Sequence, residues 1–162
     1  MDWHKANEKF NGLIKKLFHD ENWQERAKAA RELGFLKDGR ATNLMCRALK
    51  IEKDRLVCNR IIEALGRIGD PKATMIIGSK LTEEMEALNP DRFTILYIIE
   101  SFINLKDKRA LILIGPFLYS EDNELKELTQ RVFDTIEPNW RDIVERELKK
   151  NRSIEEILKK SL

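Results

Sequence analysis

The chain has 162 residues, of which 42% are hydrophobic and 36% are charged. This length suits one domain with its own core. The hydrophobic share is too high for a disordered tail, and the charged share is too high for an integral membrane protein. Lys and Arg number 30 against 28 Asp and Glu, so the net charge of +2 creates no global field that would attract nucleic acid or a membrane surface.

The N-terminal segment mixes acidic and basic residues and lacks the apolar stretch of a secretory signal. No apolar run approaches the length of a membrane span. Two cysteines do not make a disulfide framework, and free buried thiols are the expected state of Cys46 and Cys58, although their symmetric placement about a turn also permits a disulfide. We therefore expect a cytoplasmic protein with no membrane segment, and we leave its oligomeric state open.

A short pattern recurs along the chain and indicates a repeat protein. It reads LGFLKDGRA at residues 33–41, LGRIGDPKA at 65–73 and FINLKDKRA at 102–110, and a degraded copy begins at Phe133. The final alanines are 32 and 37 residues apart, and a leucine follows each of them at the eighth position. The extra residues of the longer interval fall at TEEMEALNPD, where a turn between helices can accept an insertion.

Each copy is predicted to form two amphipathic helices, because its apolar residues are spaced three and four apart. In the second copy, Asp54 is expected to cap a helix that Gly66 and Gly69 end, and Pro71 should begin the next helix. No segment alternates with period two, so no sheet is expected. Ten helices are predicted, at 3–18, 22–36, 40–50, 55–68, 72–87, 91–105, 109–119, 123–136, 139–149 and 153–160.

Consecutive helices would form about five antiparallel hairpins that stack side by side and bury apolar faces which no hairpin can bury alone. Small side chains on these faces permit close helix approach, namely Ala27, Ala30, Ala41, Ala64 and Ala73. We treat residues 1–162 as a single repeat domain, with an N-terminal cap helix at 1–19, repeats at 20–150 and a C-terminal cap helix at 151–162. Either cap could instead be a contact for a partner or a second copy.

The segments ERAKAARELGFLKDGRATNLMCRAL and VCNRIIEALGRIGDPKATMIIGSKL resemble HEAT-like repeats, in particular the short form of phycobilin-lyase-type proteins. The resemblance covers about residues 20–150 and implies an all-α fold, a right-handed α-α superhelix. It also implies that the second helix of each hairpin lines a concave face that serves for binding. A basic residue early in the second helix is part of the family pattern, and Arg26 and Lys126 match it, whereas Cys58 and Ile95 do not.

By this register, the outward residues of the second helices form a predicted ridge that would contact a partner. Its members are Trp23, Arg31, Arg55, Glu63, Arg67, Arg92, Tyr97, Glu100 and Arg131. Asn59 falls in the same row as Glu63 and Arg67, since spacing of four keeps residues on one helical edge. A face with a Trp, a Tyr and several Arg suits a protein segment or an anionic ligand. The alternative is that these charges only solvate the surface.

Motifs for catalysis are absent from the sequence. It contains no phosphate-binding glycine loop, no GxSxG and no HExxH. His4 and His19 lack the spacing of metal ligands, so neither a metal nor a cofactor is expected.

We therefore predict a non-enzymatic binding or scaffold module that holds a protein or peptide. The alternatives are a nucleic-acid-binding or DNA-glycosylase-like HEAT protein and an accessory subunit of a larger enzyme. Nucleic acid is the less favoured partner, because Glu63, Glu100 and Glu127 interrupt the basic residues of this outward face.

Overall fold

The computed structural model describes residues 3–150 and 152–161, and every element in that part of the chain is helical. The elements are α1 (Trp3–His19), α2 (Trp23–Leu36), α3 (Ala41–Ile51), α4 (Arg55–Ile68), η1 (Pro71–Ala73), α5 (Thr74–Glu86), α6 (Arg92–Leu105), α7 (Arg109–Ile114), η2 (Gly115–Tyr119), α8 (Asn123–Ile136), α9 (Trp140–Leu148) and α10 (Ile154–Ser161). The ten predicted helices are confirmed, as is the all-α fold.

Two predicted helices contain a change of helical type at a proline. The segment expected at 72–87 begins as the 3₁₀ turn η1, with Pro71 in its first turn, and the segment expected at 109–119 turns from α7 into η2 at Gly115 and Pro116. Proline has no N–H to donate, and its ring clashes with the carbonyl four residues earlier. The α-helical ladder therefore does not continue through Pro116.

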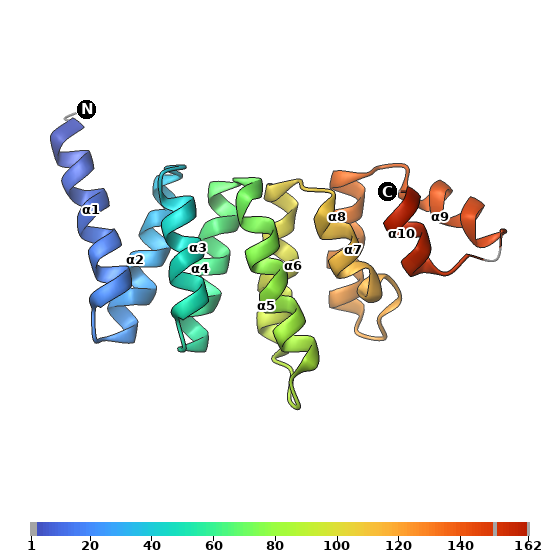
Figure 1. The fold of residues 1–162 in the computed structure, drawn as a ribbon, viewed down its shortest axis with the longest axis horizontal. Coiled ribbons are helices and arrows are strands. Elements are labelled where there is room, and N and C mark those ends of the chain that lie inside the picture. Colours follow the sequence, from blue (N-terminus) through green and yellow to red (C-terminus); the bar gives the residue numbers. More distant parts are fainter. Residues whose placement is uncertain (1–2, 151, 162) are drawn as a thin grey trace.

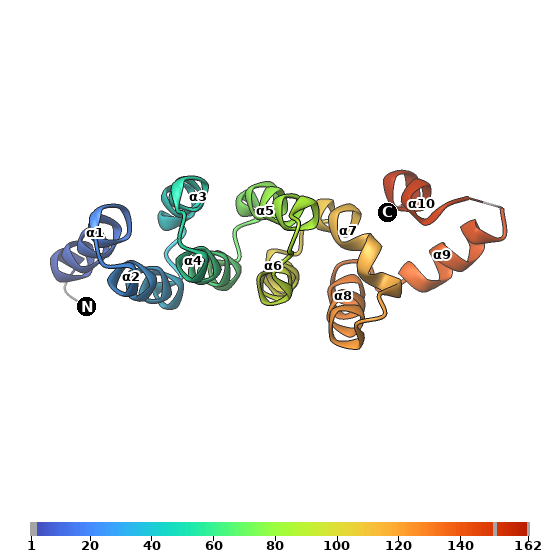
Figure 2. The same ribbon diagram turned by 90° about the horizontal axis from the view of Figure 1, so that it is seen from below.

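The hairpins stack in two layers that Figure 2 shows end on. The first helices of the hairpins, α1, α3, α5 and α7, form one layer, and the second helices, α2, α4, α6 and α8, form the other (Figures 1 and 2). Neighbours within the second layer contact one another directly, α2 with α4, α4 with α6, and α6 with α8. The last pair differs, because α10 contacts α7 and η2 as well as α9 and so extends the first layer.

The recurring sequence pattern forms a recurring turn between hairpins. The residues that end α2, α4 and α6 have a positive φ, at Lys37 (49°), Gly69 (77°) and Lys106 (51°). An aspartate follows and accepts a hydrogen bond from the backbone N–H two residues later, at Asp38 (2.9 Å), Asp70 (3.0 Å) and Asp107 (3.0 Å). The alanine that ends each pattern, Ala41, Ala73 or Ala110, is fully buried. The pattern is therefore the signature of the turn and of the first buried residue after it.

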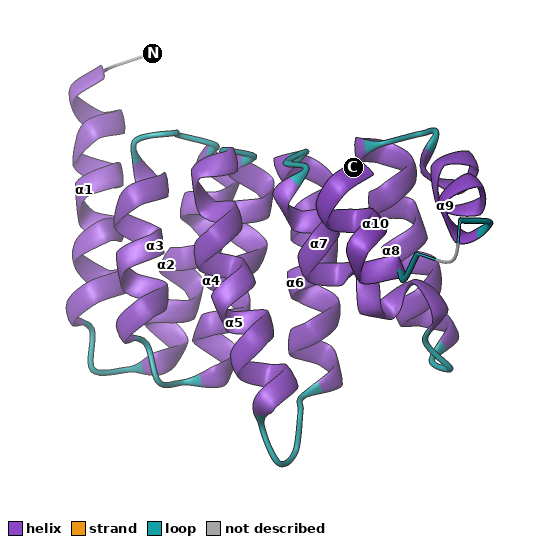
Figure 3. Cartoon of the chain, turned by 45° about the vertical axis from the view of Figure 1, so that its right-hand side comes forward, coloured by secondary structure: helices purple, strands orange, loops and turns teal. Residues whose placement is uncertain are grey.

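Side-chain caps begin the second helices. The expected cap Asp54 is confirmed, since its carboxylate accepts a hydrogen bond from the Val57 N–H, and Asn22, Asp91 and Asp122 cap α2, α6 and α8 in the same way. The longer interval between repeats lies at the connection of α5 and α6, which projects beyond the other connections (Figures 1 and 3). Leu88 at its tip is 99% exposed.

Glycines set the approach of the second helices. A Cβ at Gly34 would lie 2.8 Å from Cα and Cβ of Ala64, and a Cβ at Gly66 would lie 2.9 Å from Cα and Cβ of Ser101. The expectation that Gly66 helps to end its helix is wrong, because α4 continues to Ile68 and Gly69 alone adopts the left-handed cap. Gly66 instead lets α4 and α6 pack closely.

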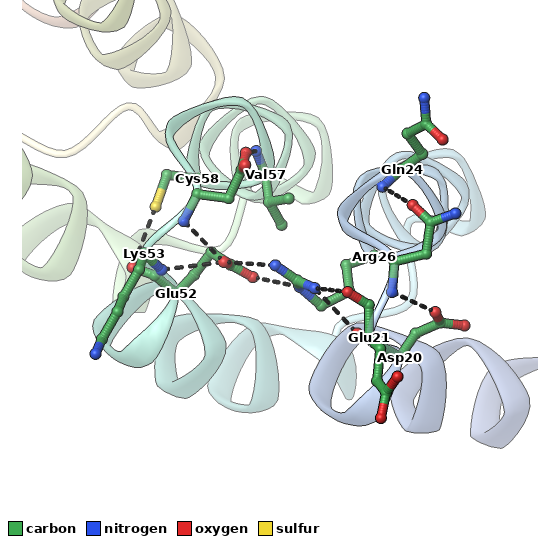
Figure 4. A network of polar contacts seen from close by, with 10 residues as sticks. Asp20, Glu21, Gln24, Arg26, Glu52, Lys53, Val57 and Cys58 are labelled. Atoms are coloured by element: carbon green, nitrogen blue, oxygen red, sulfur yellow. Dashed lines mark hydrogen bonds and ion pairs between the residues drawn. The ribbon is translucent and has the colours of Figure 1, made fainter.

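An ion pair ties the first hairpin to the second (Figure 4). Arg26 donates from Nε and Nη2 to the two carboxylate oxygens of Glu52, at 2.8 and 3.0 Å, and both side chains are largely buried. Its Nη1 donates to the carbonyls of Asp20 and Glu21. The guanidinium thus joins the loop before α2 to the loop before α4.

Candidate functional site

The predicted ridge lies on the second-helix layer, but the structure separates its members. Trp23, Arg55 and Arg92 are the first residues of α2, α4 and α6. The others lie further along their helices: Arg31 in α2, Glu63 and Arg67 in α4, Tyr97 and Glu100 in α6, and Arg131 in α8. The two groups have different surroundings.

Five of the predicted residues line a groove across α4, α6 and α8, here called the second-helix groove. Its larger hollow, of about 390 Å³, lies between α6 and α8 and is lined by Phe93, Leu96, Tyr97, Glu100, Glu124, Glu127, Leu128 and Arg131. A smaller hollow of about 130 Å³, between α4 and α6, is lined by Glu63, Gly66, Arg67, Tyr97, Glu100, Ser101 and Asn104. Tyr97 and Glu100 border both hollows, so the two form one surface.

The position of the larger hollow follows from the sequence of the second helices. Gly34 in α2 and Gly66 in α4 each admit the backbone of the next second helix. The equivalent position in α6 is Ile103, which is half-buried. The contact of α6 with α8 is the least extensive of the three contacts within the layer. A branched side chain where the earlier repeats have glycine prevents the same close approach of α6 and α8, and the larger hollow lies between these two helices.

Aromatic rings are accessible along this face. Phe93 is 66% exposed and Phe35 is 58% exposed, and Tyr97 is half-buried. Arg67 lies over the Phe35 ring at 4.3 Å from its centroid, and Arg60 lies over the Tyr97 ring at 5.7 Å. An exposed aromatic ring with a cation on one side is a recognition element used at binding surfaces.

The charged groups of the groove fall into paired and unpaired sets. Glu63 accepts hydrogen bonds from Arg60 and Arg67, both at 2.7 Å, and Glu124 forms an ion pair with Arg92. Within residues 3–150 and 152–161, no hydrogen bond or ion pair is made by the side chains of Glu100, Glu127 and Arg131. These three side chains are exposed and have their full hydrogen-bonding capacity free for a partner.

Arg55 and Arg92 bind neighbouring repeats instead of facing the groove. Arg55 forms ion pairs with Asp91, the cap of α6, at 3.0 Å and with Glu84 at 3.9 Å. Arg92 donates to Asp122, the cap of α8, and its hydrogen bond lowers the pKa of that carboxyl to about 2. Together with Arg26 and Glu52, these pairs link each second helix to the start of the next.

The remaining predicted residues, Trp23 and Arg31, lie outside both hollows. Trp23 is 40% exposed at the start of α2. Arg31 lies over the Phe35 ring at 5.5 Å from its centroid. Arg31 therefore extends the aromatic and basic face toward the N-terminal repeat.

One outward assignment is wrong. Asn59 is buried, 4% exposed, and its Oδ1 accepts a hydrogen bond of 3.0 Å from the Thr94 hydroxyl. Asn59 lies between α4 and α6. The helix α6 covers this edge of α4 as well as the face of α4 that packs in the core. The spacing of apolar residues along one helix cannot show that a hydrogen bond between two polar side chains lies inside such a contact.

Besides Glu127, which was predicted to face outward but not named in the ridge, four residues of the larger hollow were not predicted: Phe93, Leu96, Glu124 and Leu128. Phe93 is a large aromatic one residue after the start of α6, off the apolar face. This position outside the apolar face was the sequence signal that could have identified Phe93, because an exposed aromatic residue there commonly marks a contact surface.

The thiols and imidazoles do not gather into a site. Both cysteines are free, and burial raises the pKa of Cys46 and raises that of Cys58 to about 11. A buried thiol with a raised pKa is a poor nucleophile near neutral pH. Within the described ranges, no three His, Cys, Asp or Glu side chains are grouped so that they could hold a metal ion, and this includes His4 and His19.

A separate, more apolar hollow of about 350 Å³ lies at the C-terminal end, between η2 and α10. It is lined by Ile112, Gly115, Pro116, Tyr119, Ile154, Glu155, Leu158 and Lys159. A Cβ at Gly115 would lie 2.0 Å from Cδ1 of Leu158, so glycine at this position admits α10. The hollow therefore belongs to the seating of the last helix on the first layer.

The two layers of hairpins and the repeated turn define an α-solenoid, and its second-helix layer carries an open groove. Residues 10–84 match the family model described as HEAT repeats. Residues 10–84 therefore consist of HEAT-like repeats, as the sequence resemblance predicted. The narrower resemblance to phycobilin-lyase-type repeats stays a prediction. A search of curated proteins finds no match.

Across the described parts of the chain, no helix combines the length and the hydrophobicity needed to cross a membrane.

Proposed function

We propose that this protein is a non-enzymatic binding module whose second-helix groove holds a segment of a protein or peptide partner. HEAT repeats commonly mediate protein interactions, so the family favours this class of function. The observation that carries the proposal is the hollow between α6 and α8, which joins exposed aromatic surface to charged side chains without partners. Binding sites are concave and mostly apolar, with a few polar groups that orient the ligand.

A protein partner suits this groove better than nucleic acid does. Glu100, Glu124 and Glu127 line the larger hollow against the single guanidinium of Arg131. A phosphate backbone entering it would meet the unpaired carboxylates of Glu100 and Glu127, whereas nucleic-acid sites place basic groups on one side. The expected cytoplasmic location is part of the same proposal.

The proposal is tested by comparing capture of partners by the wild type and by two matched double variants. Phe93→Ala with Arg131→Ala removes an exposed ring and a free guanidinium from the groove. Arg47→Ala with Met75→Ala removes a guanidinium and an exposed apolar side chain from the first-helix layer. Partners captured from cell extract by the immobilised protein are identified by mass spectrometry, and circular dichroism checks that both variants fold.

We expect proteins that the wild type and the first-layer variant retain and the groove variant loses. A partner retained equally by all three proteins would show that the groove is not the binding surface.

A further inference from the structure

We infer that the second-helix groove selects a cationic peptide segment, in which an arginine or lysine side chain lies along Tyr97 with its charge between Glu100 and Glu127. This inference rests on the proposed function and specifies the chemistry of the partner. It follows from the charge of the hollow, its aromatic wall and the way in which its other ions are already paired.

The charged groups that line the larger hollow are the carboxylates of Glu100, Glu124 and Glu127 and the guanidinium of Arg131. Glu124 is neutralised by Arg92, whose guanidinium also binds Asp122. Glu100 on α6 and Glu127 on α8 have no ionic partner among the described residues, so the walls of the hollow each present a free carboxylate. A cation between them would be attracted from both sides.

Phe93, Leu96, Tyr97 and Leu128 supply the apolar part of the hollow, and Phe93 is 66% exposed. A lysine or arginine side chain has an apolar stem and a charged end, so it can cover such a surface while its charge reaches a carboxylate. Arginine also stacks on aromatic rings and binds carboxylates with two donors. The hollow of about 390 Å³ is large enough for a side chain of this kind and its backbone.

The other acidic side chains of the second helices differ from these two carboxylates. They pair with basic side chains of the same or a neighbouring repeat, as Glu63 does with Arg60 and Arg67 and as Glu124 does with Arg92. Glu100 and Glu127 are not part of these pairs, and both border the larger hollow. Charge complementarity therefore favours a basic segment over an acidic or purely apolar one.

The test uses peptides selected from a phage-displayed library of random sequences on the immobilised full-length protein. Each selected peptide is synthesised with a fluorescein label, and its dissociation constant is measured by fluorescence anisotropy. Three variants are compared with the wild type. Glu100→Gln with Glu127→Gln removes the charges and keeps the side-chain shapes. Phe93→Ala removes part of the apolar wall. Glu8→Gln with Glu86→Gln removes the same net charge from exposed positions of α1 and α5 in the first layer.

We expect the selected peptides to be rich in arginine or lysine. The Glu100/Glu127 variant should weaken their binding at least tenfold, and replacement of the peptide's arginines by citrulline should have a similar effect. The Glu8/Glu86 variant should change the dissociation constant less than twofold. A labelled DNA duplex of the same concentration should not compete.

Other outcomes overturn the inference in distinguishable ways. Peptides that need Phe93 but carry no basic residue would refute the cationic partner and leave the binding function standing. Basic peptides weakened equally by the groove and first-layer variants would show attraction to general surface charge. Selected peptides that are indifferent to Phe93, or competition by the DNA duplex, would refute both the inference and the proposed function.

Discussion

Two lysines adopt the left-handed backbone conformation that a glycine adopts at the equivalent turn. Lys37 and Lys106 end α2 and α6 with φ of 49° and 51°, whereas Gly69 ends α4 with φ of 77°. The left-handed region brings Cβ too close to the following carbonyl oxygen, which costs about 1–2 kcal/mol in residues other than glycine. Both lysine side chains are exposed and form no ion pair within the described residues, so nothing at these positions compensates for the strain.

Replacing Lys106 by glycine should therefore stabilise the protein. We expect the free energy of unfolding to rise by about 0.5–1 kcal/mol, because relief of the left-handed strain exceeds the additional backbone entropy of glycine in the unfolded chain. Urea denaturation followed by circular dichroism measures the change.

The reciprocal substitution, Gly69→Ala, is the control for this turn. Its φ of 77° strains any residue with a Cβ, so it should lower the midpoint of unfolding. A Lys106→Gly variant that is no more stable than the wild type would show that this turn carries no conformational strain.

At the scale of the elements, glycine spacing decides where the layer is tight and where it is open. Gly34 and Gly66 allow α2, α4 and α6 to pack closely, and Ile103 replaces them where α6 meets α8. The larger hollow lies at the interface of the layer that lacks a glycine.

Substitution of Gly66 by alanine tests this close approach. Its Cβ would lie 2.9 Å from backbone and side-chain carbon of Ser101, so α4 and α6 must separate, at a cost of about 1–3 kcal/mol. Gly12 in α1 is the matched control, because a Cβ there meets nothing within 4 Å. Gly12→Ala should stabilise by up to about 1 kcal/mol through helix propensity. Thermal unfolding of both variants should show shifts of opposite sign, and equal shifts would contradict the packing argument.

The ion pair between hairpins predicts a dependence of stability on pH. Burial alone would raise the pKa of Glu52, but hydrogen bonds from Arg26 and from the N–H groups of Asp54 and Lys53 outweigh it and lower the pKa below its ordinary 4.5. The carboxylate therefore stabilises the fold above about pH 4.5, and this contribution is lost as the pH falls through the lower folded value.

Arg26→Met should cost about 2–3 kcal/mol near pH 7, since it leaves a largely buried carboxylate without its cation. The difference from the wild type should shrink as the pH falls below 4.5. Arg40→Met is the control, because its pair with Asp38 is more exposed and should contribute less. Urea titrations at several pH values measure both, and a difference that does not change with pH would refute the role of the Glu52 charge.

At the scale of the whole molecule, each hairpin contacts only its neighbours, so stability should be local. The central helix α4 contacts second helices on both sides, whereas α10 is held at one end of the first layer. Ile61 in α4 and Ile157 in α10 are both fully buried, and loss of either side chain to alanine should cost about 2–5 kcal/mol of local packing.

Hydrogen exchange distinguishes the two positions. Ile157→Ala should speed exchange in α9 and α10 and leave α2 to α6 unchanged, because α10 can separate without opening the central repeats. Ile61→Ala should speed exchange in α2, α4 and α6 together. Uniform acceleration in the Ile157→Ala variant would indicate that the molecule unfolds as one cooperative unit.

The candidate site was only partly predictable at this scale. Spacing of four identified the second-helix face and placed Glu63, Arg67, Tyr97, Glu100 and Arg131 on it, and these residues line the groove. The same spacing could not separate them from Arg55 and Arg92, whose partners Asp91 and Asp122 lie 36 and 30 residues away. It also placed Asn59 outward, because burial by a neighbouring helix leaves no trace in the sequence of one helix.

The local sequence was sufficient to predict the helices, the repeated turn and the stacking of helix pairs. Helix caps, residues with left-handed backbone and the spacing of apolar residues all act over a few positions. Only the tertiary structure decides which charged side chains form ion pairs within the fold and which remain unpaired. Ion pairs between hairpins depend on distances that the helix packing sets. That packing depends on whether one position holds glycine, as at Gly66, or isoleucine, as at Ile103.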